Sequence, residues 1–215
     1  SFPTRRSSDL FLLEFDDLGA GAVDTTETIS GATPTFTRAT TAWTISSTGT
    51  ILSVASGTAR SYYSPSGTYL GYLAEGARTN LVVQSQDFSA TWSAVGTPTI
   101  SGGTTTLGAL SLDTIGDNSA AALEGYSQVV GFTADAVKAI SIFVKKGTST
   151  SSIVRVRDTT AGADRLLMAI TWSGDTPVVT ATTGTDLTGT PEQFGTSGVF
   201  RLRFATSAVT AANTN

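Results

Sequence analysis

The sequence predicts an all-β protein, an antiparallel β-sandwich preceded by a region rich in β-hairpins. The chain holds short runs in which apolar and polar residues alternate, and 22 of its 215 residues are glycine. Only 14% of its residues are charged, and helical periodicity is almost absent. These features are typical of many short, hydroxyl-rich strands that are joined by glycine turns.

The first ten residues, SFPTRRSSDL, are left out of the fold prediction. Written back into codons, they are similar to the end of a common short-read sequencing adapter. We therefore interpret residues 1–10 as a translated artefact at the end of a metagenomic fragment. The last residues follow an apparent strand without a closing element, so we expect the carboxyl end of the domain to be missing.

Residues 11–86 are expected to form a hairpin-rich fibre or linker region. Turn sequences such as Ser47-Thr48-Gly49 and Pro65-Ser66-Gly67 separate its short strands. The expected strands read FLLEF, FTRAT, AWTIS, TILSV, RSYYS, YLGYLA and TNLVVQ. Hairpins this short are seldom stable alone in water, so this region should pack on the following domain or on other copies of itself.

Residues 87–215 are expected to form the β-sandwich, in the form of a jelly roll. Three longer runs alternate clearly, and each has one apolar face. These faces carry Ile140, Ile142 and Val144 in the first run, Leu166, Met168, Ile170 and Trp172 in the second, and Phe200, Leu202 and Phe204 in the third. Arg201 and Arg203 are expected to point outward.

The composition excludes several classes of function. The net charge is −4 and the basic residues are scattered, so no basic face is expected for nucleic acid. The chain has no cysteine and no histidine, which removes thiolate metal sites and the commonest general base. No apolar run approaches the roughly 20 residues of a membrane span, so neither membrane insertion nor a signal peptide is expected.

The stretch YLGYLAEGARTNLVVQ places Glu75, Arg78 and Asn80 between two apolar runs. An arginine fork can hold a carboxylate through two hydrogen bonds, and an asparagine can close a turn. We interpret these three residues as a structural clasp at the joint between the two regions. A lone carboxylate beside an arginine does not suit glycoside hydrolysis, which uses two carboxyl groups.

Two polar loops could carry chemistry. Asp113, Asp117 and Asn118 offer the clustered oxygens that Ca²⁺ takes, but their spacing misses the EF-hand pattern and an ordinary polar turn is favoured. Asp158 and Asp164 flank a short loop and are the candidate acids for a polysaccharide depolymerase, the least favoured function. No catalytic motif is found, so the chain is not expected to be an enzyme and no cofactor is expected.

The candidate carbohydrate-binding residues are Tyr126, Arg155, Arg157 and Trp172. Flat aromatic rings can stack on sugars beside a few fixed polar groups, and the two arginines on one strand face could hold an anionic sugar. Each has a simpler interpretation as well. Trp172 alternates with core residues, and the arginines could lie on a solvated outer face.

One segment also resembles a family of bacteriophage structural proteins. The resemblance lies in FTRATTAWTISSTGTI and ARSYYSPSGTYLGYLAEGARTNLVVQSQDFSATW, from residue 11 to about Trp92. The family pattern falls on residues 36–39, Arg60, Tyr62, residues 70–75 and 78–81, then Ser85, Asp87, Phe88 and Trp92. One departure is Gly76 and Ala77, where a second acidic or polar residue is often found.

Proteins of this family are tail-fibre or head-fibre proteins, often joined to a lectin-like, concanavalin A-like or carbohydrate-binding-module-like jelly roll. The resemblance therefore implies a virion protein that attaches to a cell-surface glycan of a bacterial host. Other virion proteins and further copies of the chain, as a trimer, are the implied partners. A purely architectural fibre or oligomerisation module is the alternative.

Overall fold

The computed structural model describes residues 36–73, 80–119, 122–132, 136–209 and 213–214. The chain divides into two compact units, Ser1–Gly76 and Ala77–Asn215. All regular structure in the described residues is β-strand, and every pairing between strands is antiparallel. No described segment forms a helix that is long and apolar enough to cross a membrane. The predicted all-β class is confirmed.

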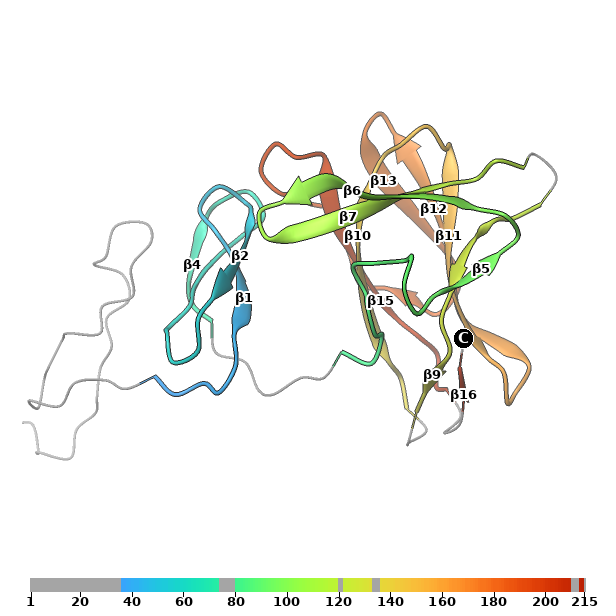
Figure 1. Ribbon diagram of the computed structural model, residues 1–215, viewed down its shortest axis with the longest axis horizontal. Helices are drawn as coiled ribbons and strands as arrows, with labels where there is room; N and C mark the ends of the chain where they lie inside the picture. Colours follow the sequence, from blue (N-terminus) through green and yellow to red (C-terminus); the bar gives the residue numbers. More distant parts are fainter. Residues whose placement is uncertain (1–35, 74–79, 120–121, 133–135, 210–212, 215) are drawn as a thin grey trace, which may run out of the picture. The chain divides into compact units, whose positions relative to one another are not determined.

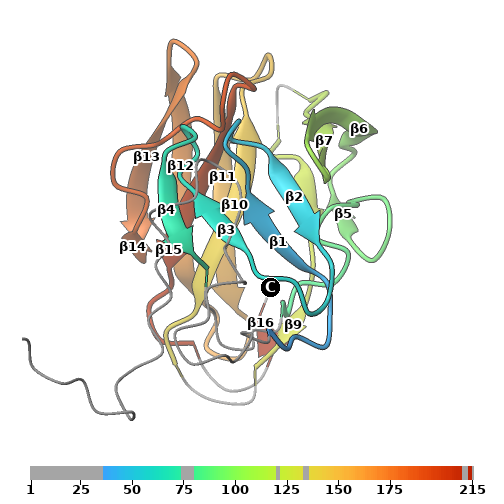
Figure 2. The ribbon, with the colours of Figure 1, turned by 90° about the vertical axis from the view of Figure 1, so that its left-hand side faces the viewer.

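The first unit contains two short hairpins, shown in blue and teal in Figure 2. β1 (Ala42–Ile45) pairs with β2 (Ile51–Val54), and β3 (Ser61–Tyr63) pairs with β4 (Tyr69–Tyr72). The Thr44 hydroxyl donates to the Ser61 carbonyl at 2.5 Å, which links one hairpin to the other. Four of the strands expected from the sequence are therefore confirmed in this unit, but the strand expected over FTRAT is wrong, because residues 36–40 form no strand.

The turn in the first hairpin follows from its sequence. The Gly49 N–H donates to the Ser46 carbonyl at 3.0 Å, and the Ser46 N–H donates to the Thr50 carbonyl at 2.9 Å. Gly49 has φ of 71°, a conformation that glycine adopts without steric cost. This is the three-residue hairpin loop, a tight turn followed by a left-handed residue, which the Ser-Thr-Gly sequence favours.

The second unit contains two larger antiparallel sheets, which can be followed in Figure 1. One sheet has the order β10-β15-β14, and the other has the order β13-β12-β11-β16-β9. The first comprises β10 (Ala139–Lys145), β14 (Thr185–Asp186) and β15 (Val199–Ala205). The second comprises β9 (Val130–Gly131), β11 (Ser151–Asp158), β12 (Ala163–Ser173), β13 (Thr176–Thr183) and β16 (Asn213–Thr214).

Two two-stranded sheets complete the second unit. β5 (Ser93–Val95) pairs with β8 (Gly125–Ser127), and β6 (Thr99–Leu107) pairs with β7 (Leu110–Gly116). The two larger sheets thus account for β9 to β16, while β5 to β8 form separate ribbons.

A single apolar cluster joins the two larger sheets. Leu166, Met168 and Ile170 of β12 pack with Leu202 and Phe204 of β15, and all five are at most 2% exposed. Each such side chain contributes about 1.5–3 kcal/mol when it is removed from water. The apolar partners around them are Ile140, Ile142, Val144, Val154, Val156, Trp172 and Val179. The predicted inward faces of β10, β12 and β15 are therefore confirmed.

The prediction of a strand over TNLVVQ is wrong. Residues 82–86 form bends and turns instead of a strand. The Asn80 side-chain oxygen accepts the Val82 N–H at 3.2 Å, and Gln84 has φ of 50°. A local side-chain hydrogen bond of this kind competes with strand pairing. Gln128 then holds this segment, because its side chain accepts from the Val83 N–H at 2.9 Å and donates to the Val83 carbonyl at 3.0 Å.

Candidate functional site

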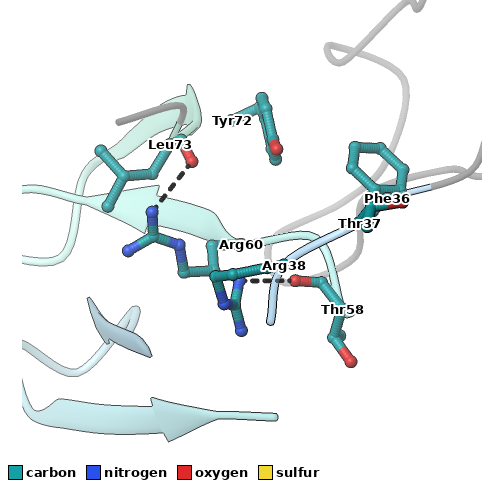
Figure 3. A pocket seen from close by; sticks show the side chains of 7 residues that line it. All are labelled: Phe36, Thr37, Arg38, Thr58, Arg60, Tyr72 and Leu73. Atoms are coloured by element: carbon teal, nitrogen blue, oxygen red, sulfur yellow. Dashed lines mark hydrogen bonds between the residues drawn. The ribbon is translucent and has the colours of Figure 1, made fainter. Parts of the chain in front are cut away.

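Two hollows in the described residues, one in each unit, are candidate places for a ligand. The first is a cavity of about 160 Å³ in the hairpin unit. Figure 3 shows its seven lining residues, which come from the segment before β1, the segment before β3 and the end of β4. They are Phe36, Thr37, Arg38, Thr58, Arg60, Tyr72 and Leu73.

The two arginines of this cavity are engaged with the backbone. Arg60 is only 7% exposed and donates to the Trp43 carbonyl at 2.9 Å and to the Leu73 carbonyl at 3.5 Å. Arg38 donates to the carbonyls of Thr40, Val54, Ala55 and Thr58. Carbonyl groups at the ends of short strands need such donors when they are removed from water. The cavity is therefore walled by groups that hold the hairpins together.

The second hollow is a groove of about 400 Å³ in the larger unit. Lys145 and Lys146 at the end of β10 line it, together with Asp175 in the β12–β13 turn. The loop before β15 lines it as well, with Gln193, Thr196, Ser197 and Gly198. Its volume falls within the about 300–1,000 Å³ that is usual for small-molecule sites.

The sequence reasoning missed this groove because its residues come from three separate segments. The Gly174-Asp175 pair between two alternating runs indicates a hairpin tip, and the two adjacent lysines mark a strand end. Neither signal shows that the two places meet. In the structure the Lys146 ammonium donates to the Gly174 carbonyl at 2.6 Å and pairs with the Asp175 carboxylate at 3.4 Å.

Arg155 and Arg157 lie together on the outward face of β11, as the sequence predicts. Both contact one carboxylate: Arg155 Nε lies 2.8 Å and Arg157 Nη1 3.4 Å from Asp164 Oδ1. Arg157 also donates to the Gly162 carbonyl at 3.0 Å. An anionic sugar at this place would therefore have to compete with Asp164.

The two aromatic candidates do not join those arginines. Trp172 packs against the apolar cluster, on the inward face of its sheet. Tyr126 lies in β8, opposite Ala94 of β5, and its ring is tilted by 53° to the Phe88 ring, with the centroids 6.0 Å apart. The four candidate residues thus occupy three separate places in the second unit.

Asp158 and Asp164, the candidate acid pair, point to opposite faces of their sheet. The Asp158 side chain is fully buried beside Arg165 at 3.2 Å, and it accepts the Ala161 N–H at 2.9 Å. Arg157 pairs with Asp164 across the strands, and Val156 with Leu166, so Arg165 is an extra residue that forms a β-bulge. A bulge reverses the alternation and turns Asp164 outward.

The calcium candidates are occupied by backbone contacts. Asp113 accepts the Phe88 N–H at 3.0 Å and the Gly103 N–H at 3.2 Å. Asp117 accepts the Ser119 N–H at 2.9 Å, and the Asn118 amide donates to the Thr97 carbonyl at 3.0 Å. Among the described residues, no three acidic, histidine or cysteine side chains gather closely enough to hold a metal ion.

The clasp lies partly outside the described residues, because Glu75 and Arg78 fall in the gap at 74–79. Asn80 closes a turn through the Val82 N–H, and its amide donates to the Ser85 hydroxyl at 3.1 Å. The boundary between the two units falls at Gly76/Ala77, inside this stretch. The sequence placed the boundary ten residues later, at Gln86/Asp87.

Comparison of the chain with models of protein families, with curated proteins and with solved structures finds no match.

Proposed function

We propose that the chain is part of a bacteriophage tail or head fibre, whose second unit attaches the particle to a glycan on a bacterial surface. One observation carries most of the fibre part of this proposal. Two arginines of the family pattern, Arg38 and Arg60, are both used to hold strand-end carbonyls. Arginines that form hydrogen bonds to backbone carbonyls hold the fold together, and this use of the charged residues favours an architectural module over a catalytic one.

The second unit supports the attachment part. Its two larger sheets share one apolar cluster, and we take them as the jelly roll that the sequence predicts. The open polar groove at Lys145 gives this unit a place for a small polar ligand. Weak binding at one such place is sufficient in a fibre, because several linked copies raise the avidity by roughly 10²- to 10⁴-fold.

A purely architectural module is the second candidate, and one observation favours it. Large apolar side chains of the hairpin unit are exposed: Trp43 by 47%, Leu52 by 45% and Leu70 by 57%. Exposed apolar side chains on short hairpins are typical of surfaces that pack on another chain. Contacts between copies in a trimer would cover them.

Binding to bacterial cells distinguishes these two candidates. The chain is fused to a trimerisation domain and incubated with a panel of bacteria and with arrayed surface polysaccharides. We expect saturable binding to at least one of them. Absence of binding throughout the panel, together with trimer formation by the chain without its fusion partner, would favour the architectural module. The adjacent reading frames test the virion assignment, because genes for capsid or tail proteins should flank this one.

A further inference from the structure

The wall of the groove beside Lys145 is a rigid loop. The Phe194 N–H donates to the Val199 carbonyl at 2.9 Å, and the Ser197 N–H donates to the Phe194 carbonyl at 3.1 Å. The Phe194 ring is 1% exposed and packs edge-on against the Phe143 ring at 5.4 Å. These contacts hold the loop in a structure that contains no ligand. A site that needs no ordering loses less free energy on binding.

Some polar groups of this loop form hydrogen bonds within the loop, and others are left to line the groove. The Ser197 hydroxyl is used inside the loop, because it donates to the Phe194 carbonyl at 2.7 Å. The Gln193 amide nitrogen donates to the Gly195 carbonyl at 3.1 Å, which fixes the side chain. Its amide oxygen and the hydroxyl of the exposed Thr196 have no hydrogen bond within the described residues, and both residues line the groove. Oxygen atoms of this kind suit a ligand with several hydroxyl groups.

The groove is locally positive in a chain that is negative overall. Two lysines and one aspartate line it, whereas the net charge of the chain is −4. Lys146 is engaged with Gly174 and Asp175, but Lys145 has no hydrogen bond or ion pair within the described part of the chain. The stem of Lys145 lies beside Gly198, where an added Cβ would come 3.5 Å from Lys145 Cε.

We propose that this groove binds an acidic sugar, whose carboxylate pairs with the Lys145 ammonium. The hydroxyl groups of the sugar would bond to Gln193 and Thr196, which also line the groove. The lysine ammonium is a compact point charge with three donors, which can pair with one anionic group such as a carboxylate. This inference deepens the proposed function and rests on it, since it names the class of glycan that the second unit recognises.

Calorimetric titration of the whole chain with a hexuronic acid tetramer tests this inference. The matched ligand is the same tetramer with its carboxyl groups reduced to alcohols. We expect K145Q to weaken uronate binding about tenfold, because a charged hydrogen bond is lost. D175N should strengthen it about two- to fivefold, because the negative charge that competes with the ligand is removed. The reduced tetramer should bind weakly to all variants.

K138Q is the matched control, because Lys138 precedes the same strand at its other end and does not line the groove. It should leave the affinity within about twofold of the wild type, which separates a local contact from the change in net charge. Equal loss in K138Q and K145Q would overturn the inference. Equal binding of the two tetramers, or displacement of the uronate by an equal concentration of inorganic phosphate, would overturn it as well.

Measurements with both the tetramer and a bacterial polysaccharide distinguish a failure of this inference from a failure of the proposed function. If the tetramer does not bind but the trimeric chain still binds a bacterial polysaccharide, the groove is the wrong site or the ligand class is wrong, and the proposed function stands. If neither binds, both fail. If the polysaccharide binding is lost in K145Q and kept in K138Q, both are supported.

Discussion

Arg60 is almost completely buried, and its guanidinium replaces water at carbonyl groups that the short hairpins cannot pair. The donor atoms lie 2.9 Å from the Trp43 carbonyl and 3.5 Å from the Leu73 carbonyl. Arg38 does the same for the ends of β2 and for the segments beside it. At the scale of single residues, the first unit is therefore stabilised by charge-assisted hydrogen bonds to the backbone as well as by its small apolar core.

Replacement of Arg60 by methionine should weaken the hairpin unit. The R60M variant keeps an unbranched side chain but leaves buried carbonyls without donors, which costs about 1–3 kcal/mol. Hydrogen exchange of the amides in β1 to β4 measures this loss as faster exchange. R201M is the control, because Arg201 is exposed on β15 and its replacement should not change these amides. Unchanged exchange in R60M would contradict the structural role of the arginine.

Glu124 is a second residue whose environment can be measured. The Asn118 N–H at 2.9 Å, with the Thr97 hydroxyl at 2.9 Å, lowers the pKa of the Glu124 carboxyl group below its usual value of 4.5. The unfolded chain therefore binds this proton more tightly than the folded chain does. The contribution of Glu124 to stability is present above pH 4.5 and is lost as the pH falls through the lowered, folded-state value.

Thermal unfolding between about pH 3 and pH 6 tests this linkage. We expect the melting temperature of the wild type to fall more steeply with acid than that of E124Q, which cannot titrate at this position. Other carboxyl groups, such as Asp87, whose pKa is lowered by the Ser89 hydroxyl, are common to both proteins and cancel in the comparison. Parallel curves would show that Glu124 is not bonded in this way.

At the scale of elements, the alternation of apolar residues predicts the strands and their inward faces well. It succeeds for β10, β12 and β15 because burial on one face imposes a period of two. The alternation does not predict the structure where local hydrogen bonds or a bulge determine the backbone conformation. The Asn80 side chain holds an apolar run in a turn, and the bulge at Arg165 places Asp164 on the outer face of the sheet. The groove was also beyond prediction, because it requires the β12–β13 turn to meet the end of β10.

Two glycines provide a test of how tightly these elements approach one another. Gly184 joins β13 to β14 with φ of 85°, and an added Cβ would lie 2.7 Å from Leu166 Cδ1 and 2.8 Å from the Ala205 carbonyl oxygen. Gly162, in the turn between β11 and β12, has φ of 64° but no atom within 4 Å of an added Cβ. The two positions share the backbone strain and differ in the space around them.

G162A should lower the free energy of unfolding by about 1–2 kcal/mol, the cost of a left-handed alanine. G184A should lower it by about 2 kcal/mol more, because the methyl group meets backbone and core atoms that cannot easily move. Urea denaturation followed by circular dichroism measures both. Equal losses in the two variants would mean that the strands around Gly184 are further apart than the structure shows.

At the scale of the whole molecule, the chain divides into two units, and we propose a different role for each. The first unit uses its charged residues to hold short hairpins and exposes apolar side chains that suit further copies of the chain. The second unit has the larger core and the open, positively charged groove. Its two candidate acids point to opposite faces of one sheet, an arrangement that does not place both beside one glycosidic bond.

The most direct test of this account is the retention of bacterial surface polysaccharides by the intact, trimerised chain, with free reducing sugar assayed in the same sample. We expect that at least one acidic polysaccharide is retained, that the corresponding neutral polymer is not, and that no sugar is released. Release of sugar, abolished by D164N, would show a depolymerase. Retention of no polysaccharide would contradict the role in attachment.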